Sequence, residues 1–230
     1  SWDFGDNTTS TETSPVHTYA QDGVFTVKLT ATNQDGNSTK TQAVVISSTV
    51  ITLARLTGDV SKTWKLKPGV GSFKVGSGKG QGNYFGGDLD LSTERPCLFN
   101  DEFIFKVAGN AYTYDSKGDV WTEPYMGLTY GCNPDSSLPS ASAAWATGNH
   151  TYSFTAATAS SPAFITVTGT GAFIALPKAY NGGEYTAGPP TTNGSVTYEV
   201  LSYVSSGGTE TMVITLDIGG GTFWTFTLIH

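Results

Sequence analysis

Alternation of apolar and polar side chains is clearest in the middle of the chain. Phe103, Phe105 and Val107 are each separated by one residue, so in an extended strand they share one face. Residues 108–110, Ala-Gly-Asn, supply turn chemistry, and the alternation resumes over residues 111–114, where two tyrosines fall on one face. This pattern predicts a β-hairpin with one apolar face.

Segments with the same period recur along the chain, and turn residues separate them. We find no convincing amphipathic helix, and Trp64 and Trp224 lie within strand alternations that place them in the core. Many short strands with regular turns predict an all-β protein, whose larger part is a jelly-roll-type β-sandwich. The predicted strands outside the hairpin are residues 24–32, 41–46, 63–68, 152–155, 164–169, 171–176, 195–204, 211–218 and 222–229.

The composition agrees with a secreted all-β protein. Only 13% of the residues are charged and 28 are glycine, as expected when strands favour β-branched and aromatic residues and every reversal needs turn residues. The net charge is −7, with lysine and arginine scattered singly, which argues against nucleic acid as a partner. No apolar run is long enough to span a bilayer. We expect a monomer that needs no cofactor.

The start of the chain suggests a processed protein. The first residue is Ser1 rather than Met, and the residues after it already belong to a strand motif. We therefore expect a piece of a longer precursor, whose missing part would carry any export signal or lipid anchor. The expected location is extracellular or on the surface of an outer membrane.

Two cysteines, Cys97 and Cys132, flank the central hairpin. If they pair, they stabilise the fold by about 2–4 kcal/mol and the compartment must be oxidising. Two buried free thiols are the alternative, because spacing in the sequence does not establish disulfide geometry. Neither cysteine belongs to a Cys-x-x-Cys pattern, so we expect no zinc site.

The first 48 residues carry three motifs in order: Trp-Asp-Phe-Gly-Asp at residues 2–6, His-Thr-Tyr at 17–19, and Gly-Val-Phe-Thr-Val-Lys-Leu-Thr-Ala-Thr-Asn at 23–33. With these motifs the segment resembles a polycystic kidney disease (PKD) domain. The resemblance implies a partial immunoglobulin-like sandwich that lacks its early strands and acts mostly as a spacer. Asn7 stands where the family usually carries glycine. Residues 47–49 are the predicted joint to a second domain, residues 50–230.

Three carboxylates of this segment, Asp3, Asp6 and Asp35, are candidate ligands of a structural calcium ion. Solvated turn carboxylates, which need no ion, are the simpler explanation of all three. His17 has no cysteine or second histidine nearby in the sequence, so we expect a hydrogen-bonded structural residue rather than a ligand or a base.

A second resemblance involves residues 50–230. It depends on Lys-Thr-Trp-Lys-Leu at 62–66, Cys-Leu-Phe-Asn-Asp-Glu-Phe at 97–103, Leu-Pro-Lys-Ala-Tyr-Asn-Gly-Gly-Glu at 176–184, and the glycine-rich run before Phe223-Trp224. The segment resembles a C-terminal module that follows PKD domains in extracellular proteins of bacteroidete polysaccharide-utilisation loci. Those proteins are surface glycan-binding proteins. The resemblance implies a non-catalytic carbohydrate-binding module, with β-glucans such as laminarin among its ligands.

Sugar recognition needs flat aromatic rings for the pyranose faces and polar groups for the hydroxyls. Trp121 and Tyr125 flank Glu123-Pro124 in a polar stretch that we expect on the surface, although packing onto the sheet is the alternative for both rings. The candidate platforms are Tyr84, Trp121, Tyr125, Trp145 and Tyr180, and the candidate polar partners are Asp88, Glu123, Lys178, Asn181 and Glu184.

Two other classes of function stay open. Asp88, Asp90 and Glu94 would project from one face of a strand, and glycoside hydrolases need paired carboxylates of this kind. A charged edge strand that resists pairing with other chains explains the same residues. No histidine is placed to activate a serine nucleophile. A structural or adhesive surface module, without an exposed ring cluster, is the third class.

Overall fold

The structure is a computed structural model that describes residues 1–20, 23–46, 49–189 and 194–230. The chain divides into two compact units, one made of Ser1–Val50 with Val204–Glu210 and the other of Ile51–Tyr203 with Thr211–His230. Most of the predicted joint at 47–49 lies outside the described residues. Among the described helices, none is both long and apolar enough to cross a bilayer.

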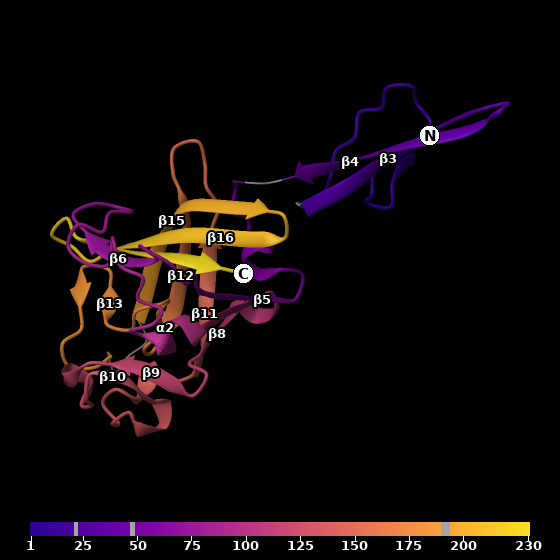
Figure 1. Cartoon of the computed structure of the whole chain (residues 1–230). Coiled ribbons are helices and arrows are strands. Elements are labelled where there is room, and N and C mark those ends of the chain that lie inside the picture. Colours follow the sequence, from indigo (N-terminus) through magenta and orange to yellow (C-terminus); the bar gives the residue numbers. More distant parts are fainter. Residues whose placement is uncertain (21–22, 47–48, 190–193) are drawn as a thin grey trace. The chain divides into compact units, whose positions relative to one another are not determined.

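The smaller unit is built on one antiparallel sheet with the strand order β2-β1-β3-β4. Its long hairpin is the predicted one, since β3, which alternates in burial, pairs with β4 across a short turn (Figure 1). The strands are β1 (Trp2–Asp3), β2 (Thr9–Ser10), β3 (Gly23–Asn33) and β4 (Gly36–Ile46).

The larger unit contains thirteen strands among its described residues and only short helices. The strands are β5 (Ser61–Leu66), β6 (Phe73–Gly76), β7 (Glu102–Lys106), β8 (Ala111–Asp115), β9 (Asp119–Thr122), β10 (Gly131–Pro134), β11 (Gly148–Thr155), β12 (Ala163–Gly169), β13 (Ala179–Tyr180), β14 (Gly183–Glu184), β15 (Gly194–Ser206), β16 (Thr209–Asp217) and β17 (Phe223–Ile229). The helices are α1 (Leu53–Thr57) and α2 (Pro96–Asn100), with 3-10 turns η1 (Ala108–Asn110), η2 (Pro124–Met126), η3 (Asp135–Ser137) and η4 (Ala143–Trp145).

Strand order shows how the main sheet closes. It runs β16-β15-β12-β11-β8-β7-β5-β17-β6, and the first strand, β16, also pairs with β17, so the sheet closes into a barrel (Figure 1). The all-β prediction is confirmed, and opposed walls of sheet enclose one core as in a sandwich. The connections are those of a meander rather than the crossed connections of a jelly roll, because hairpins and short excursions join strands that follow one another in the chain.

The central hairpin forms as predicted. In β7 and β8, Phe103 pairs with Tyr114 and Phe105 pairs with Tyr112, and all four side chains are buried. Trp64 and Trp224 are also in the core, as expected from their strand alternations. The aromatic face of this hairpin therefore forms one wall of the barrel core.

Cys97 and Cys132 form a disulfide, with their Cα atoms 5.8 Å apart. The bond links helix α2, at its buried residue Cys97, to β10, which pairs with β9 outside the main sheet. The prediction that the cysteines pair is confirmed. The bond fixes a small two-stranded excursion against the barrel.

Residues 171–176 were predicted to form a strand, and this prediction is wrong. They form an irregular segment whose side chains are all buried, including Phe173, Ile174 and Leu176. A continuous apolar run suits any buried segment, so its sequence does not distinguish a buried coil from a buried strand. The segment fills the core with side chains that the barrel walls do not supply.

Two tyrosine hydroxyls satisfy the backbone of this buried segment. The Tyr198 hydroxyl accepts from the Ile174 N–H at 2.8 Å and donates to the Ile174 carbonyl at 3.2 Å, while the Tyr112 hydroxyl donates to the Phe173 carbonyl at 2.6 Å. Both tyrosines are fully buried. Because a coil has no ladder of its own, these hydroxyls replace the hydrogen bonds that a strand would have made.

A carboxylate is also buried in this core. Asp101 is 1% exposed, and its Oδ1 accepts from the Tyr114 hydroxyl at 3.0 Å. Its Oδ2 has no hydrogen-bond partner among the described residues. Burial, together with the nearby Asp119 and Asp115, raises the pKa of Asp101 well above its usual value. The folded protein therefore favours the neutral carboxyl.

We predict that Tyr198→Phe lowers the free energy of unfolding by about 1–3 kcal/mol, because the backbone of Ile174 loses its partner while remaining buried. Urea denaturation measures this loss. The same change at Tyr84, a tyrosine that is 60% exposed, should alter stability by less than about 0.5 kcal/mol. Equal losses from the two variants would contradict the role of the Tyr198 hydroxyl.

We predict that Asp101→Asn stabilises the protein by about 1 kcal/mol at pH 7 and by less at pH 4. In the unfolded chain the carboxyl ionises near pH 4, whereas in the folded chain its pKa is raised. Folding then takes up a proton, so the free energy of unfolding falls as the pH rises from about 4 towards the raised pKa. Thermal melts across this pH range, with exposed Asp88→Asn as the control, test whether the gain grows with pH at Asp101 alone.

Candidate functional site

A groove of about 220 Å³ lies on the outer face of the barrel. It crosses β12, β15, β16 and β17, whose inward side chains belong to the core. Since successive residues of a strand point to opposite faces, the groove is lined by the residues between these core positions. They are Phe164, Thr197, Glu199, Thr215, Asp217 and Phe223, together with Lys79 and Asn181 from neighbouring segments.

Two aromatic–acid pairs bracket the floor of the groove. Phe164 is directly opposite Glu199 in β12 and β15, and Phe223 is directly opposite Asp217 in β17 and β16. Both phenyl rings are half-buried, so each keeps an exposed part on a face that otherwise meets water. An apolar ring beside a carboxylate is a combination that suits a sugar, with its apolar C–H face and its hydroxyls.

Two threonines line the groove between these pairs, Thr197 and the buried Thr215, and each contacts a threonine of the neighbouring strand. Thr166 and Thr197 share a hydrogen bond at 2.9 Å, and Thr215 and Thr225 share one at 3.2 Å. The Thr215 hydroxyl also donates to the Trp224 carbonyl at 2.9 Å. Cross-strand contacts therefore hold the threonines of the floor in fixed rotamers.

One wall of the groove is the glycine-rich loop 77–83. The Gly80 N–H donates to the Thr225 hydroxyl at 3.1 Å, which attaches the loop to the floor. A Cβ at Gly82 would collide with the backbone of Gly87, so the loop packs on the chain that follows it. The loop places Lys79 beside the floor, where its Nζ lies 2.6 Å from the Glu199 Oε2.

The other wall is the tip of the β13–β14 hairpin. The Asn181 side chain accepts from the Thr197 N–H at 2.7 Å and donates to the Thr197 carbonyl at 2.9 Å, as a neighbouring strand would. The Gly182 N–H donates to the Asp217 carbonyl at 3.1 Å. The tip therefore bridges β15 and β16, and Asn181 helps to build the groove that it lines.

Behind this hairpin, several of the predicted site residues gather into one cluster. Lys178 lies 3.2 Å from Glu123 and 3.6 Å from Glu184, and the Trp224 indole donates to Glu184 at 2.6 Å. The three ionic side chains are between 17% and 32% exposed. The pairs tie the hairpin to the segment before η2, so this cluster supports the wall that carries Asn181.

Aromatic rings surround these charges. Tyr180 stacks on Tyr185 with centroids 4.3 Å apart, and Trp145 contacts both Tyr185 and Tyr125 at about 6 Å. Burial, and to a lesser degree Glu123 and Glu184, raises the pKa of Tyr125 above its usual value. These rings pack mainly on one another and on the core rather than facing solvent.

The prediction that Trp145 and Trp121 offer exposed platforms is wrong. Trp145 is 1% exposed, because the small alanines of η4 allow its helical turn to pack closely on the core. Trp121 lies in strand β9 and is 6% exposed, and the Arg95 guanidinium stacks 4.6 Å above its ring. A sugar therefore finds no free face on either indole.

Two further predicted residues lie apart from the groove lining. Tyr84 is 60% exposed and Asp88 is exposed, both in the segment that follows the glycine-rich loop. Neither lines the groove. Tyr84 therefore remains an available ring, but the acids and amides of the floor do not surround it.

The carboxylates of the hydrolase alternative do not share a strand face. Residues 88–94 form turns rather than a strand, because Asp90 accepts hydrogen bonds from Ser92 and from the Gly69 N–H. The bonds from Ser92 lower the pKa of Asp90, whereas a general acid needs a raised one. Glu94 lies beside Arg95 at 3.3 Å. The predicted geometry of opposed acids is therefore wrong at this segment.

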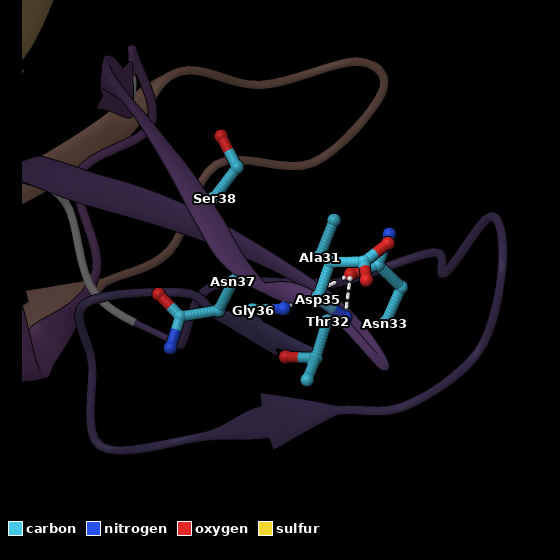
Figure 2. Close-up of a pocket in the computed structure, with 7 residues that line it drawn as sticks. All are labelled: Ala31, Thr32, Asn33, Asp35, Gly36, Asn37 and Ser38. Carbon is cyan, nitrogen blue, oxygen red and sulfur yellow. Dashed lines mark hydrogen bonds between the residues drawn. The ribbon is translucent and has the colours of Figure 1, made fainter.

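The carboxylates proposed for calcium are not brought together either. Asp35 lies at the turn of the β3–β4 hairpin, where Figure 2 shows Asn33 accepting from the Asp35 and Gly36 N–H groups. The Asp3 carboxylate accepts a hydrogen bond from the Gly5 N–H, two residues later, at 2.9 Å. Within the described part of the chain, no three His, Cys, Asp or Glu residues are grouped to hold a metal ion.

His17 is a structural residue, as predicted. Its Nε2 lies 2.7 Å from Asp6, and its ring stacks on Phe4 with centroids 4.1 Å apart. Hydrogen bonds from Thr8, together with His17, lower the pKa of Asp6. The pair joins residue 17 to the turn between β1 and β2.

Sequence reasoning missed the two phenylalanines and two acids of the groove floor. Phe164 and Phe223 alternate with core residues, so they occupy the outward positions of β12 and β17, where threonine is the rule. A bulky apolar residue at a water-facing position is the signal that could have found them. Glu199 and Asp217 become visible only once strand register places them opposite these rings.

Comparison with known proteins identifies the first unit. The PKD domain model matches residues 1–48, as predicted from the three motifs. The rest of the chain lies outside this match. A PKD domain is consistent with an extracellular protein that carries a binding or adhesive module.

Three bacterial proteins share a short stretch with the chain. A microbial collagenase of Vibrio alginolyticus is 48% identical over 48 residues, which is 20% of this chain and 6% of that protein. Collagenase ColA of Bacillus cereus strain ATCC 14579 is 48% identical over 44 residues, and collagenase ColQ1 of Bacillus cereus strain Q1 is 43% identical over 44 residues, each 19% of this chain and 5% of the relative. The chain thus covers about a twentieth of these relatives.

We predict that Lys178→Met lowers the free energy of unfolding by about 2 kcal/mol, because Glu123 and Glu184 keep their partly buried charges without their shared partner. Chemical denaturation measures the loss. Lys65→Met is the matched control, since Lys65 is 43% exposed and lies 2.9 Å from Glu102, which also contacts Lys117. A loss at Lys178 no greater than at Lys65 would contradict the supporting role of the cluster.

Proposed function

We propose that the chain is a non-catalytic, extracellular carbohydrate-binding protein, in which a PKD domain accompanies a barrel module that binds a polysaccharide. The groove across β12, β15, β16 and β17 is the proposed binding site. The observation that carries the proposal is the placement of two partly exposed phenyl rings, each directly opposite a carboxylate on the neighbouring strand, along one groove. β-Glucans such as laminarin are the proposed first ligands.

The chemistry of the groove supports this proposal. A pyranose ring presents C–H groups on its faces and hydroxyls at its edges, so Phe164 and Phe223 would stack on the faces while Asp217 and Glu199 would receive hydroxyls. The groove crosses four adjacent strands, which suits one stretch of a long chain. Binding of this kind is wet and of modest affinity.

Two features support an extracellular location. The disulfide between Cys97 and Cys132 is of a kind that persists in oxidising compartments. The PKD match is the second feature. Attachment to an outer membrane through a lipid anchor is part of the same proposal, as is a monomeric state.

We also propose that the chain does not hydrolyse the polysaccharide that it binds. This proposal is supported by the turn conformation of residues 88–94 and by the lowered pKa of Asp90. Release of reducing sugar from any polysaccharide that the protein binds, lost in Glu94→Gln, would favour a hydrolase instead.

We predict that the protein is retarded in affinity electrophoresis by at least one neutral polysaccharide of a panel of laminarin, lichenan, xylan and galactomannan. Phe223→Ala and Phe164→Ala should each weaken the retardation about tenfold, because loss of one stacked ring costs about 1–1.5 kcal/mol. Val107→Ala, at an exposed residue outside the groove, should bind as the unmodified chain does.

Tyr84→Ala separates the groove from the neighbouring surface. Tyr84 is exposed but does not line the groove, so its loss should leave the retardation intact. Binding that depends on Tyr84 and not on the two phenylalanines would overturn the assignment of the groove. Retardation by none of the polysaccharides would count against carbohydrate binding itself.

A further inference from the structure

The groove carries three charged side chains, Lys79, Glu199 and Asp217, and their sum is −1 at neutral pH. Lys79 and Glu199 form an ion pair, with Nζ and Oε2 2.6 Å apart. Asp217 accepts a hydrogen bond from the Gly219 N–H at 2.8 Å and has no ion-pair partner in the described part of the chain. Lys79 is therefore paired with Glu199, whereas Asp217 has no cationic partner among the described residues.

The geometry of the ion pair is set by the fold on both sides. Glu199 projects from β15 next to the Phe164 ring, and its side chain is only 18% exposed. Lys79 is held by a loop that attaches to the floor through Gly80 and Thr225, and Ser77 ties the base of the loop by donating its N–H to Asn83 at 3.0 Å. The ammonium group thus lies over a carboxylate that strand pairing keeps in place.

We propose that the Lys79–Glu199 ion pair makes the groove selective for uncharged saccharides and against anionic ones. This inference rests on the proposed carbohydrate-binding function and names its ligand class. An anionic sugar, such as a uronate, needs a free cation to offset its charge. In this groove it would have to displace Glu199 from Lys79 and would also face Asp217. An uncharged sugar neither displaces Glu199 from Lys79 nor is repelled by Asp217, and it still forms hydrogen bonds in the groove.

We expect Lys79 to bind an anionic sugar once Glu199 no longer pairs with it. Glu199→Gln removes the carboxylate that holds Lys79, so the ammonium group becomes available and the groove changes from −1 to neutral. Asp217→Asn makes the same change in net charge while leaving Lys79 engaged. The two variants therefore separate the release of Lys79 from a general loss of negative charge.

The test is isothermal titration calorimetry with two probes of similar length, a neutral laminarin hexasaccharide and an oligogalacturonate hexamer. The unmodified chain should bind the neutral probe and not the uronate. Glu199→Gln should gain uronate binding by about tenfold or more, whereas Asp217→Asn should gain less than about threefold. The gain should shrink in high salt, because the freed ammonium group is exposed.

A double variant tests whether the gain depends on Lys79. Glu199→Gln with Lys79→Met should bind the uronate no better than the unmodified chain, and thermal melts should show that every variant is folded. Uronate binding by the unmodified chain as tight as neutral binding, or no gain in Glu199→Gln, would overturn the charge selection while leaving the proposed function standing. Binding of neither probe, nor of any polysaccharide in the panel, would overturn both.

Discussion

The architecture depends on a buried coil whose backbone must find hydrogen-bond partners inside the barrel. Residues 171–176 have no strand ladder, and their amide groups are out of reach of water. The hydroxyls of Tyr112 and Tyr198 meet this requirement, since each reaches the backbone of the coil from a barrel wall. The side chains of the coil then complete the core. Because its own chain fills the interior, the barrel leaves its outer face for the proposed ligand site.

That outer face combines rigidity with access. Cross-strand threonine bonds hold the floor, and the walls come from two separate excursions, the loop 77–83 and the tip of the β13–β14 hairpin. The ionic cluster around Lys178 supports the hairpin from behind. Most residues predicted as sugar ligands from the sequence therefore lie outside the groove, and Asn181 alone among them lines it. The PKD domain is a separate unit with its own sheet and ring stacking.

Local patterns predicted the elements better than they predicted the surface. Alternation identified the β7–β8 hairpin and the core positions of Trp64 and Trp224, because burial on one face leaves a period of two. The same reasoning misread residues 171–176, whose apolar run has no period. Exposure of Trp121 could not be inferred, since it depends on Arg95, twenty-six residues earlier, stacking on the ring. The acids of the groove emerge only from strand register, which is a property of the whole sheet.

The glycines in and after the loop 77–83 bear on which residues of the groove can change without altering the fold. Gly82 and Gly86 approach neighbouring backbone too closely to carry a side chain, so these glycines fix the path of the loop together with the Ser77–Asn83 and Gly80–Thr225 hydrogen bonds, none of which involves the Lys79 side chain. Lys79 can then be exchanged without rebuilding the scaffold. Related chains, or a designed library, could change ligand preference by varying this single position on an otherwise constant frame.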